Sequence, residues 1–210
     1  MRNILFIVCI CSAASCNSQT GNENTVSGNT IKNDVLPACE WCGADEVPEN
    51  TTWKTTLAPA DEPGERITIS GTVYRSDKVI PAPNVIIYVY HTNAKGIYPK
   101  KGNETGNAKR HGYLRGWMKT DANGKYEFMT IKPGAYPGGG NPAHIHMTVK
   151  EEGKDEYWLD EYLFGDDPVL LNEIEKGKFK KPAEDNFNFV LNFQKDANGN
   201  LNAVRDLVLH

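Results

Sequence analysis

Two things that this 210-residue chain lacks narrow the classes of protein to which it can belong. It has no apolar run that approaches the roughly 20 residues of a membrane-spanning helix. Its formal net charge is only -4, with acidic and basic residues interleaved, so no basic stripe is present to follow a phosphate backbone. Nucleic acid is therefore not an expected partner. The chain does contain 39% hydrophobic and 10% aromatic residues, which at this length predicts one principal domain.

The N-terminus has the pattern of a secretory signal. A basic start is followed by an apolar stretch at residues 4–10 and by small residues at 12–15. The sequence Ala-Ala-Ser-Cys at residues 13–16 also resembles the lipobox of bacterial lipoproteins, in which the cysteine becomes the lipidated first residue. We expect an exported protein, attached on the periplasmic or cell-surface side of a membrane through lipid on Cys16. Cleavage without lipid is the alternative.

Few cysteines would remain after that processing. Cys39 and Cys42 form Cys-Glu-Trp-Cys, and in an oxidising compartment we expect them to form a local structural disulfide. A redox-active pair is the alternative, but no βαβ pattern surrounds the motif. A structural zinc site would need two further ligands, and the neighbouring sequence offers none.

Three segments follow from these patterns. Residues 1–15 are the expected signal peptide. Residues 16–64 comprise the lipidated cysteine, a Ser-, Asn-, Thr- and Gly-rich flexible tether, and an irregular segment with the Cys-x-x-Cys motif. Residues 65–210 are the expected folded domain.

Short strands separated by turn signals dominate the domain. Apolar and polar residues alternate at 67–73, the period of two of a half-buried strand. Further strands are expected at 85–90, 114–120, 126–130, 144–150, 157–164, 187–193 and 203–209. The turn sequences Asp-Ala-Asn-Gly at 121–124 and 196–199 predict that each joins two neighbouring strands as a hairpin.

One helix is expected, with Asp167 as N-cap, Pro168 at its first position and Gly177 at its end. The fold class that follows is all-β, an antiparallel β-sandwich of about eight strands with one short helix.

Two histidines are candidate metal ligands. His144 and His146 lie in one expected strand, where side chains at i and i+2 point to the same face about 7 Å apart. Both imidazoles could reach one ion. A His-x-His pair alone is equally compatible with two solvent-facing histidines, so its surroundings must decide.

Two tyrosines supply those surroundings. Tyr98 and Tyr136 each occur in a Gly-x-Tyr-Pro sequence, and the following proline holds each tyrosine in an extended conformation. For any single tyrosine, a packed ring with its hydroxyl in water is the ordinary interpretation. A highly charged cation, however, favours the phenolate over the phenol, whose pKa in water is about 10. Two phenolates and two imidazoles suit Fe(III), whereas zinc usually takes Cys, His and carboxylate. We expect one non-haem Fe(III) per chain.

Several segments together resemble a known family. They read Gly-Thr-Val at 71–73, Pro-Ala-Pro-Asn-Val at 81–85, Thr-Asp at 120–121, Gly-Lys-Tyr-Glu-Phe at 124–128, Thr-Ile-Lys-Pro-Gly-Ala-Tyr-Pro at 130–137 and Pro-Ala-His-Ile-His at 142–146. Residues 69–167 resemble the intradiol ring-cleavage dioxygenases, especially protocatechuate 3,4-dioxygenase. The resemblance implies that Tyr98, Tyr136, His144 and His146 are the iron ligands.

The resemblance also implies a reaction and its partners, a catechol-type small molecule and O2. Tyr98 and an iron-bound hydroxide accept the two catechol protons, the iron draws electron density from the catecholate, and O2 attacks the ring. The ring opens between its two hydroxylated carbons to give a muconate-type diacid.

One position departs from the family pattern. Where the family commonly has an arginine three residues before the first histidine, this chain has Asn141, which carries no charge. Arg115 is a candidate for the missing cation, and a surface role is its alternative. The chain also lacks the helical N-terminal region through which the catechol 1,2-dioxygenase branch dimerises, so a homo-oligomer would need another interface.

Two other interpretations compete. A non-catalytic β-sandwich binding module at the cell surface has the same expected fold, but would have no reason to combine two Gly-x-Tyr-Pro loops with His-x-His. A zinc hydrolase would need a carboxylate base near the histidines, and the acids that follow the strand, Glu151 and Glu152, lie beyond its end.

Overall fold

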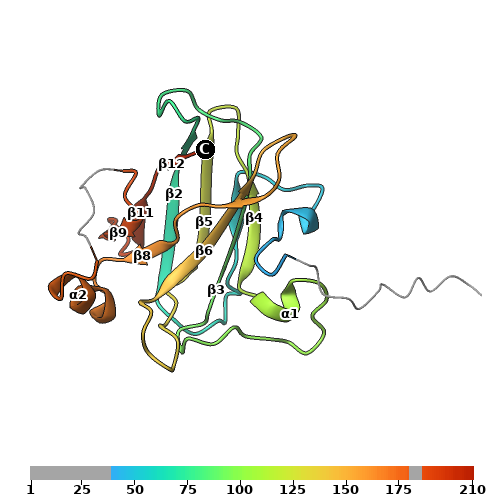
Figure 1. Ribbon diagram of the computed structural model, residues 1–210. Helices are drawn as coiled ribbons and strands as arrows, with labels where there is room; N and C mark the ends of the chain where they lie inside the picture. The colour runs from blue at the N-terminus through green and yellow to red at the C-terminus, as the bar shows by residue number, and fades with distance from the viewer. Residues whose placement is uncertain (1–38, 180–185) are drawn as a thin grey trace, which may run out of the picture. The chain divides into compact units, whose positions relative to one another are not determined.

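The computed structural model describes residues 39–179 and 186–210 (Figure 1). The expected signal peptide, Cys16 and the tether lie outside the described residues. No helix within the described ranges is long and apolar enough to cross a membrane. Two sheets form the framework of the described residues and the helices are short, so the prediction of an all-β sandwich is confirmed.

The first sheet has the order β1-β5-β2-β11-β10, with β12 also paired to β2. Its strands are β1 (Lys54–Thr56), β2 (Arg66–Tyr74), β5 (Lys125–Ile131), β10 (Gln194–Lys195), β11 (Leu201–Val204) and β12 (Leu207–Val208). The second sheet has the order β4-β3-β6-β8-β9, with β7 also paired to β6. Its strands are β3 (Ile86–His91), β4 (Arg115–Lys119), β6 (His144–Lys150), β7 (Tyr157–Trp158), β8 (Tyr162–Phe164) and β9 (Val190–Leu191).

Both sheets are mixed, whereas the sequence predicted purely antiparallel ones. Strand β2 pairs in parallel with β11 and β12, β1 pairs in parallel with β5, and β8 pairs in parallel with β9. These partners are distant in sequence, so no local turn signal could announce their direction.

The two Asp-Ala-Asn-Gly turns have different outcomes. The turn at 196–199 joins β10 to β11 as an antiparallel hairpin, as predicted. The turn at 121–124 joins strands of different sheets, because β4 pairs with β3 and β5 pairs with β2, so this hairpin prediction is wrong. In both turns the glycine N–H donates to the aspartate carbonyl at 3.0 Å. The turn reverses the chain locally, and the burial of each flanking strand decides its partner.

Three expected strands are shorter than predicted. Strands β7 and β8 divide 157–164, only β9 is formed within 187–193, and β11 and β12 are separated by two residues. At that last interruption, the Asp206 carboxylate accepts a hydrogen bond from the Thr72 N–H at 2.7 Å. The side chain therefore takes the place of a backbone acceptor in the ladder, which lets the backbone diverge.

Three short helical segments accompany the sheets within residues 39–179 and 186–210. Helix α2 (Pro168–Glu175) is the predicted helix: the Asp167 side chain accepts from the N–H groups of Val169 and Leu170, and Gly177 follows with φ 68°. Helix α1 (Ala108–His111) and the 3-10 helix η1 (Ala44–Glu46) were not predicted. At four and three residues they are too short to show a helical hydrophobic period.

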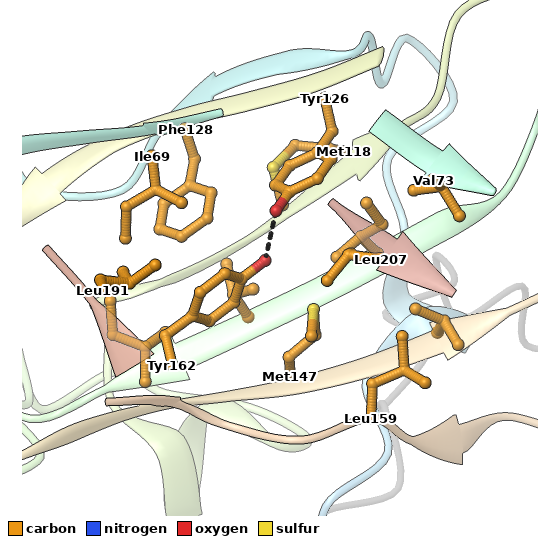
Figure 2. Close-up of a cluster of buried hydrophobic side chains, with 14 of the residues drawn as sticks. Ile69, Val73, Met118, Tyr126, Phe128, Met147, Leu159, Tyr162, Leu191 and Leu207 are labelled. Atoms are coloured by element: carbon orange, nitrogen blue, oxygen red, sulfur yellow. Dashed lines mark hydrogen bonds between the residues drawn. The ribbon is translucent and has the colours of Figure 1, made fainter. Parts of the chain in front are cut away.

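The core lies between the inner faces of the two sheets. Alternation along β6 directs Ile145, Met147 and Val149 inward, where they are fully buried. Figure 2 shows Tyr126 of the first sheet and Tyr162 of the second pointing toward one another, with 3.1 Å between their hydroxyl oxygens. The Tyr126 hydroxyl in turn donates to a backbone carbonyl at 2.7 Å, so neither buried phenol lacks a partner.

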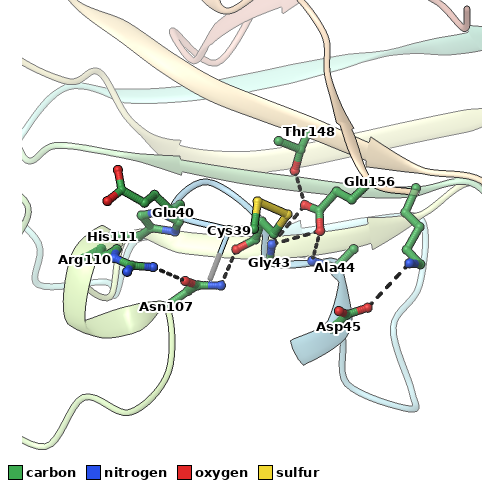
Figure 3. Close-up of a disulfide and its surroundings, with 12 residues drawn as sticks. Cys39, Glu40, Gly43, Ala44, Asp45, Asn107, Arg110, His111, Thr148 and Glu156 are labelled. Carbon is green, nitrogen blue, oxygen red and sulfur yellow. Dashed lines mark hydrogen bonds and ion pairs between the residues drawn. A yellow bond between two sulfur atoms is a disulfide. The ribbon is translucent and has the colours of Figure 1, made fainter. Parts of the chain in front are cut away.

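Ordered structure begins before residue 65, where the domain was expected to start. Strand β1 pairs with β5, and residues 39–46 lie against the second sheet. The buried Glu156 carboxylate accepts hydrogen bonds from the N–H groups of Gly43 and Ala44 at 2.9 Å and from the Thr148 hydroxyl at 2.5 Å (Figure 3). A disulfide joins Cys39 to Cys42, the pairing predicted from the sequence. We call residues 39–46 the N-terminal strap.

Candidate metal centre

Strand register places both histidines on the outer face of the second sheet. Because Ile145 points into the core, His144 and His146 point away from it. His146 pairs with Tyr90 of β3, and His144 pairs with Leu163 of β8. The face opposite the core is therefore where these candidate ligands meet their neighbours.

The two Gly-x-Tyr-Pro loops pack directly against one another. The Thr92 hydroxyl donates to the Gly134 carbonyl at 2.8 Å, and the Gly134 N–H donates to the Asn93 carbonyl at 2.9 Å. A Cβ at Gly96 would lie 1.9 Å from the Ala135 carbonyl oxygen. Glycine in each motif is thus needed for the close approach of the loops, and this approach brings the two tyrosines together.

Four side-chain atoms converge at this point. The Tyr98 and Tyr136 hydroxyl oxygens are 2.7 Å apart. The Tyr136 oxygen is 3.2 Å from Nε2 of both histidines, and the two Nε2 atoms are 3.1 Å apart. Donors bound to one ion at about 2.0–2.1 Å lie about 2.8–3.4 Å from one another. The spacing of the Tyr136 oxygen and the two Nε2 atoms therefore fits three donors of one metal ion, and the Tyr98 oxygen lies at a donor distance from Tyr136.

The second nitrogen of each imidazole supports the same arrangement. Nδ1 of His144 is 2.7 Å from the Pro142 carbonyl oxygen, which requires a proton on Nδ1 and leaves the lone pair on Nε2. Nδ1 of His146 is 2.7 Å from Oε1 of Glu161, although not aligned for a linear hydrogen bond. Both contacts are of the kind that orients metal-binding histidines.

Glu161 is the residue at this site that the sequence analysis missed. It directly precedes β8, and continuing the register of β8 by one residue sets it opposite His146. With the two histidines it forms a group whose potential ligand atoms lie within 4.8 Å of one another. The sequence alone does not indicate Glu161, because its position opposite His146 depends on the pairing of β8 with β6.

Burial shifts the pKa of several groups at this site. Burial raises the pKa of the Tyr98 phenol above its usual value, and the hydrogen bond with Tyr136 raises it further. Burial also raises the pKa of Tyr136 and lowers that of His144. Burial opposes ionisation of Glu161, but its contact with His146 prevails and lowers the pKa of the carboxyl. At neutral pH both phenols stay neutral, so only a strongly charged ion would produce the phenolates.

A layer of aromatic side chains supports the histidines. The Tyr90 ring stacks on His146 at 4.6 Å and on His111 at 3.6 Å between centroids. His111 Nδ1 is 2.7 Å from the Tyr88 hydroxyl, and its Nε2 is 2.8 Å from the Glu40 carbonyl of the N-terminal strap. The strap therefore reaches the candidate ligand through two stacked rings.

Asn141 and Arg115, the two further residues that the sequence singled out, lie in different parts of the structure. Asn141 lines a cavity of about 310 Å³ that His144 also lines. Arg115 is in register with Tyr90, on the side away from His146. Its guanidinium lies 2.6 Å from the Glu46 carboxylate and 3.3 Å from the Tyr88 hydroxyl. Arg115 thus joins the N-terminal strap to the aromatic layer and is separated from the four convergent atoms by Tyr90.

Comparison with known proteins found a family match and several similar proteins. A family model described as Dioxygenase matches residues 44–209. The beta chain of protocatechuate 3,4-dioxygenase from Burkholderia cepacia is 32% identical over 123 residues, which cover 56% of this chain and 52% of that protein. Catechol 1,2-dioxygenase 1 from Acinetobacter lwoffii is 33% identical over 130 residues, which cover 54% and 40%. The chain thus spans about half the length of these curated relatives.

Solved structures share the fold. The dioxygenase domain of a dioxygenase carbohydrate-binding protein fusion from Streptomyces sp. SirexAA-E has a TM-score of 0.56 at 23% identity and covers 77% of this chain and 90% of that one. Catechol 1,2-dioxygenase from Acinetobacter sp. ADP1 has a TM-score of 0.57 at 23% identity and covers 76% and 57%. Since the family match extends over both sheets and both tyrosine loops, this chain belongs to the intradiol ring-cleavage dioxygenase family.

Proposed function

We propose that this chain binds one Fe(III) through Tyr98, Tyr136, His144 and His146, and that it opens catechol-type rings with O2 between the two hydroxylated carbons. The convergence of the four donor atoms, with Tyr136 Oη within 2.7–3.2 Å of the other three, carries the proposal. A binding module has no use for such a cluster, whereas clustered groups with shifted pKa values are typical of functional sites.

The residues of the site would have unequal tasks. Ferric iron, when bound, would supply Lewis-acid activation of the chelated catecholate toward O2. The two imidazoles, whose Nδ1 contacts fix their orientation, would remain neutral ligands. Tyr136 is in contact with both histidines and would stay a ligand throughout. Tyr98, whose hydroxyl oxygen lies 2.7 Å from that of Tyr136, would depart and accept a catechol proton at its phenolate oxygen.

The test combines metal content, colour and product. Protein purified with iron should be red-brown from tyrosinate-to-Fe(III) charge transfer and should convert catechol to a diacid that carries both atoms of labelled O2. His144→Ala and His146→Ala should lose the metal. Tyr113→Phe is the matched control, since the Tyr113 hydroxyl donates to Glu62 at 2.5 Å, away from the four donors. A colourless protein that binds zinc instead, or a semialdehyde as product, would overturn the proposal.

We also propose that the protein is exported and lipid-anchored through Cys16. The disulfide between Cys39 and Cys42 supports an oxidising compartment. Cys16→Ala should move the protein from the membrane fraction to the soluble fraction with unchanged turnover, whereas Ser12→Ala should leave its location unchanged. A Cys16→Ala variant that stays fully with membranes would contradict the anchor.

A further inference from the structure

Two adjoining cavities open beside the candidate metal centre. The first, of about 310 Å³, is lined by His144 and Asn141, and the second, of about 450 Å³, is lined by Trp158. Glu161, Leu163 and Phe179 line both, so the cavities share one wall. The Trp158 ring centroid is 5.5 Å from that of His146. Because the candidate ligand His144 lines the first cavity, we take this shared wall as the surface that meets the ring substituent of a bound catechol.

Apolar side chains make up most of the wall. Leu163 of β8 is the strand partner of His144 and is buried together with Leu170 of α2. Phe179 and Phe189 pack against this pair, and their two rings lie edge to face at 5.8 Å between centroids. Such a surface gains free energy by covering an apolar group, and it offers a carboxylate no replacement for its water.

The charges around the cavities are mainly negative. Asp160, Glu161 and Glu173 contribute carboxylates to the lining, and Lys178 is the one cation that lines either cavity among the described residues. The Lys178 ammonium lies 3.5 Å from the Glu173 carboxylate and is therefore already paired. Arg115, the other cation considered above, is held by Glu46 on the far side of Tyr90. Among the residues that the structure describes, an anionic substituent would meet like charges without a free positive partner.

We propose that this site selects catechols with an uncharged, apolar ring substituent and discriminates against carboxylated catechols. The inference rests on the proposed function and specifies its substrate class. Asn141 at the cavity wall fits it, since an amide can hydrogen-bond a neutral group but supplies no charge for a carboxylate.

Binding separates this inference from the proposed reaction. Iron-loaded protein is titrated without O2 with 4-methylcatechol and with 3,4-dihydroxybenzoate, which differ only by methyl against carboxylate, and Kd is measured by calorimetry. We expect Kd to be at least about tenfold lower for 4-methylcatechol, because the carboxylate loses hydration and faces acidic side chains. With O2 admitted, kcat/KM should follow the same order.

A matched pair of variants tests the wall itself. Phe179→Arg introduces a cation where both cavities meet and should reduce the preference for 4-methylcatechol at least about fivefold by tightening 3,4-dihydroxybenzoate. Phe179→Leu keeps the wall apolar and should leave the preference within about twofold of wild type. Lys180 and Lys181 follow in the sequence outside the described residues, so the double variant Lys180→Ala/Lys181→Ala is included.

The outcomes are distinguishable. Turnover of both compounds with tighter binding of 3,4-dihydroxybenzoate would overturn this inference and leave the proposed function standing. If that preference disappeared in the double lysine variant, the selecting cation would be located in that segment. Failure of the iron-loaded protein to bind either catechol would overturn the proposed function and this inference together. Selective binding of 4-methylcatechol without turnover would overturn the proposed reaction and support the inference that the apolar wall selects the substrate.

Discussion

Replacement of Gly134 by alanine should separate the two tyrosine loops. A Cβ added at Gly134 would lie 2.5 Å from the Ala94 carbonyl oxygen, and the nearest atoms are backbone, which cannot rotate away. Carbon–oxygen contacts normally begin at about 3.3 Å, so one loop must move by about 0.8 Å. Gly134 has no positive φ, so the effect isolates this contact from backbone strain.

That displacement is large for a metal site. Ligand sets of this kind tolerate errors of about 0.5 Å, and misplacement by about 1 Å can lower turnover about a hundredfold. We expect Gly134→Ala to bind iron at least about tenfold more weakly, with a shifted visible spectrum. Overpacking of this kind should also lower the free energy of unfolding by about 1–3 kcal/mol. Iron titration followed by the visible spectrum, kcat/KM with catechol, and urea denaturation measure the three effects.

Gly138→Ala is the matched control. Gly138 lies two residues after Tyr136, has no atom within 4 Å of an added Cβ and has no positive φ. Its replacement should change stability by less than about 0.5 kcal/mol and leave iron affinity unchanged. If Gly134→Ala behaved like Gly138→Ala in all three assays, contact between the loops would not be what positions the phenols.

Three further predictions concern protons and ligands. Tyr136→Phe should lose most of the colour and bind iron poorly. Tyr98→Phe should keep a shifted colour and bind catechol, but turn it over about a hundredfold more slowly because a proton acceptor is lost. Equal visible spectra in the two variants would refute the unequal roles of the two tyrosines. Glu161→Gln should weaken iron binding about tenfold through His146, as measured by competition with a chelator. Burial lowers the pKa of His91 and of His111 to about 4, so between pH 6.5 and pH 4 the unfolded chain binds more protons than the folded chain. The free energy of unfolding of the metal-free protein should therefore fall on acidification through that window. For the fully buried His91 alone, the loss at pH 5 is about 2 kcal/mol. Equal free energies of unfolding at pH 5 and pH 7, measured by urea denaturation, would contradict this.

Local features of the sequence were sufficient to single out the four convergent side chains as candidate metal ligands. His144 and His146 share a face because side chains in a strand alternate, and both Gly-x-Tyr-Pro motifs occupy loops because proline and glycine disfavour regular structure. The helix α2 was predictable for the same reason, since its cap Asp167 and its terminal Gly177 act through neighbouring backbone groups.

Only the tertiary structure decided what surrounds those side chains. The 121–124 turn crosses between sheets, and Glu161 and Tyr90 flank His146 because β6 lies between β8 and β3. Strand partners are selected by burial summed over residues far apart in the chain, and the sequence of any one segment does not contain that sum. The same holds for the N-terminal strap, whose place depends on the buried carboxylate of Glu156, more than a hundred residues later in the chain.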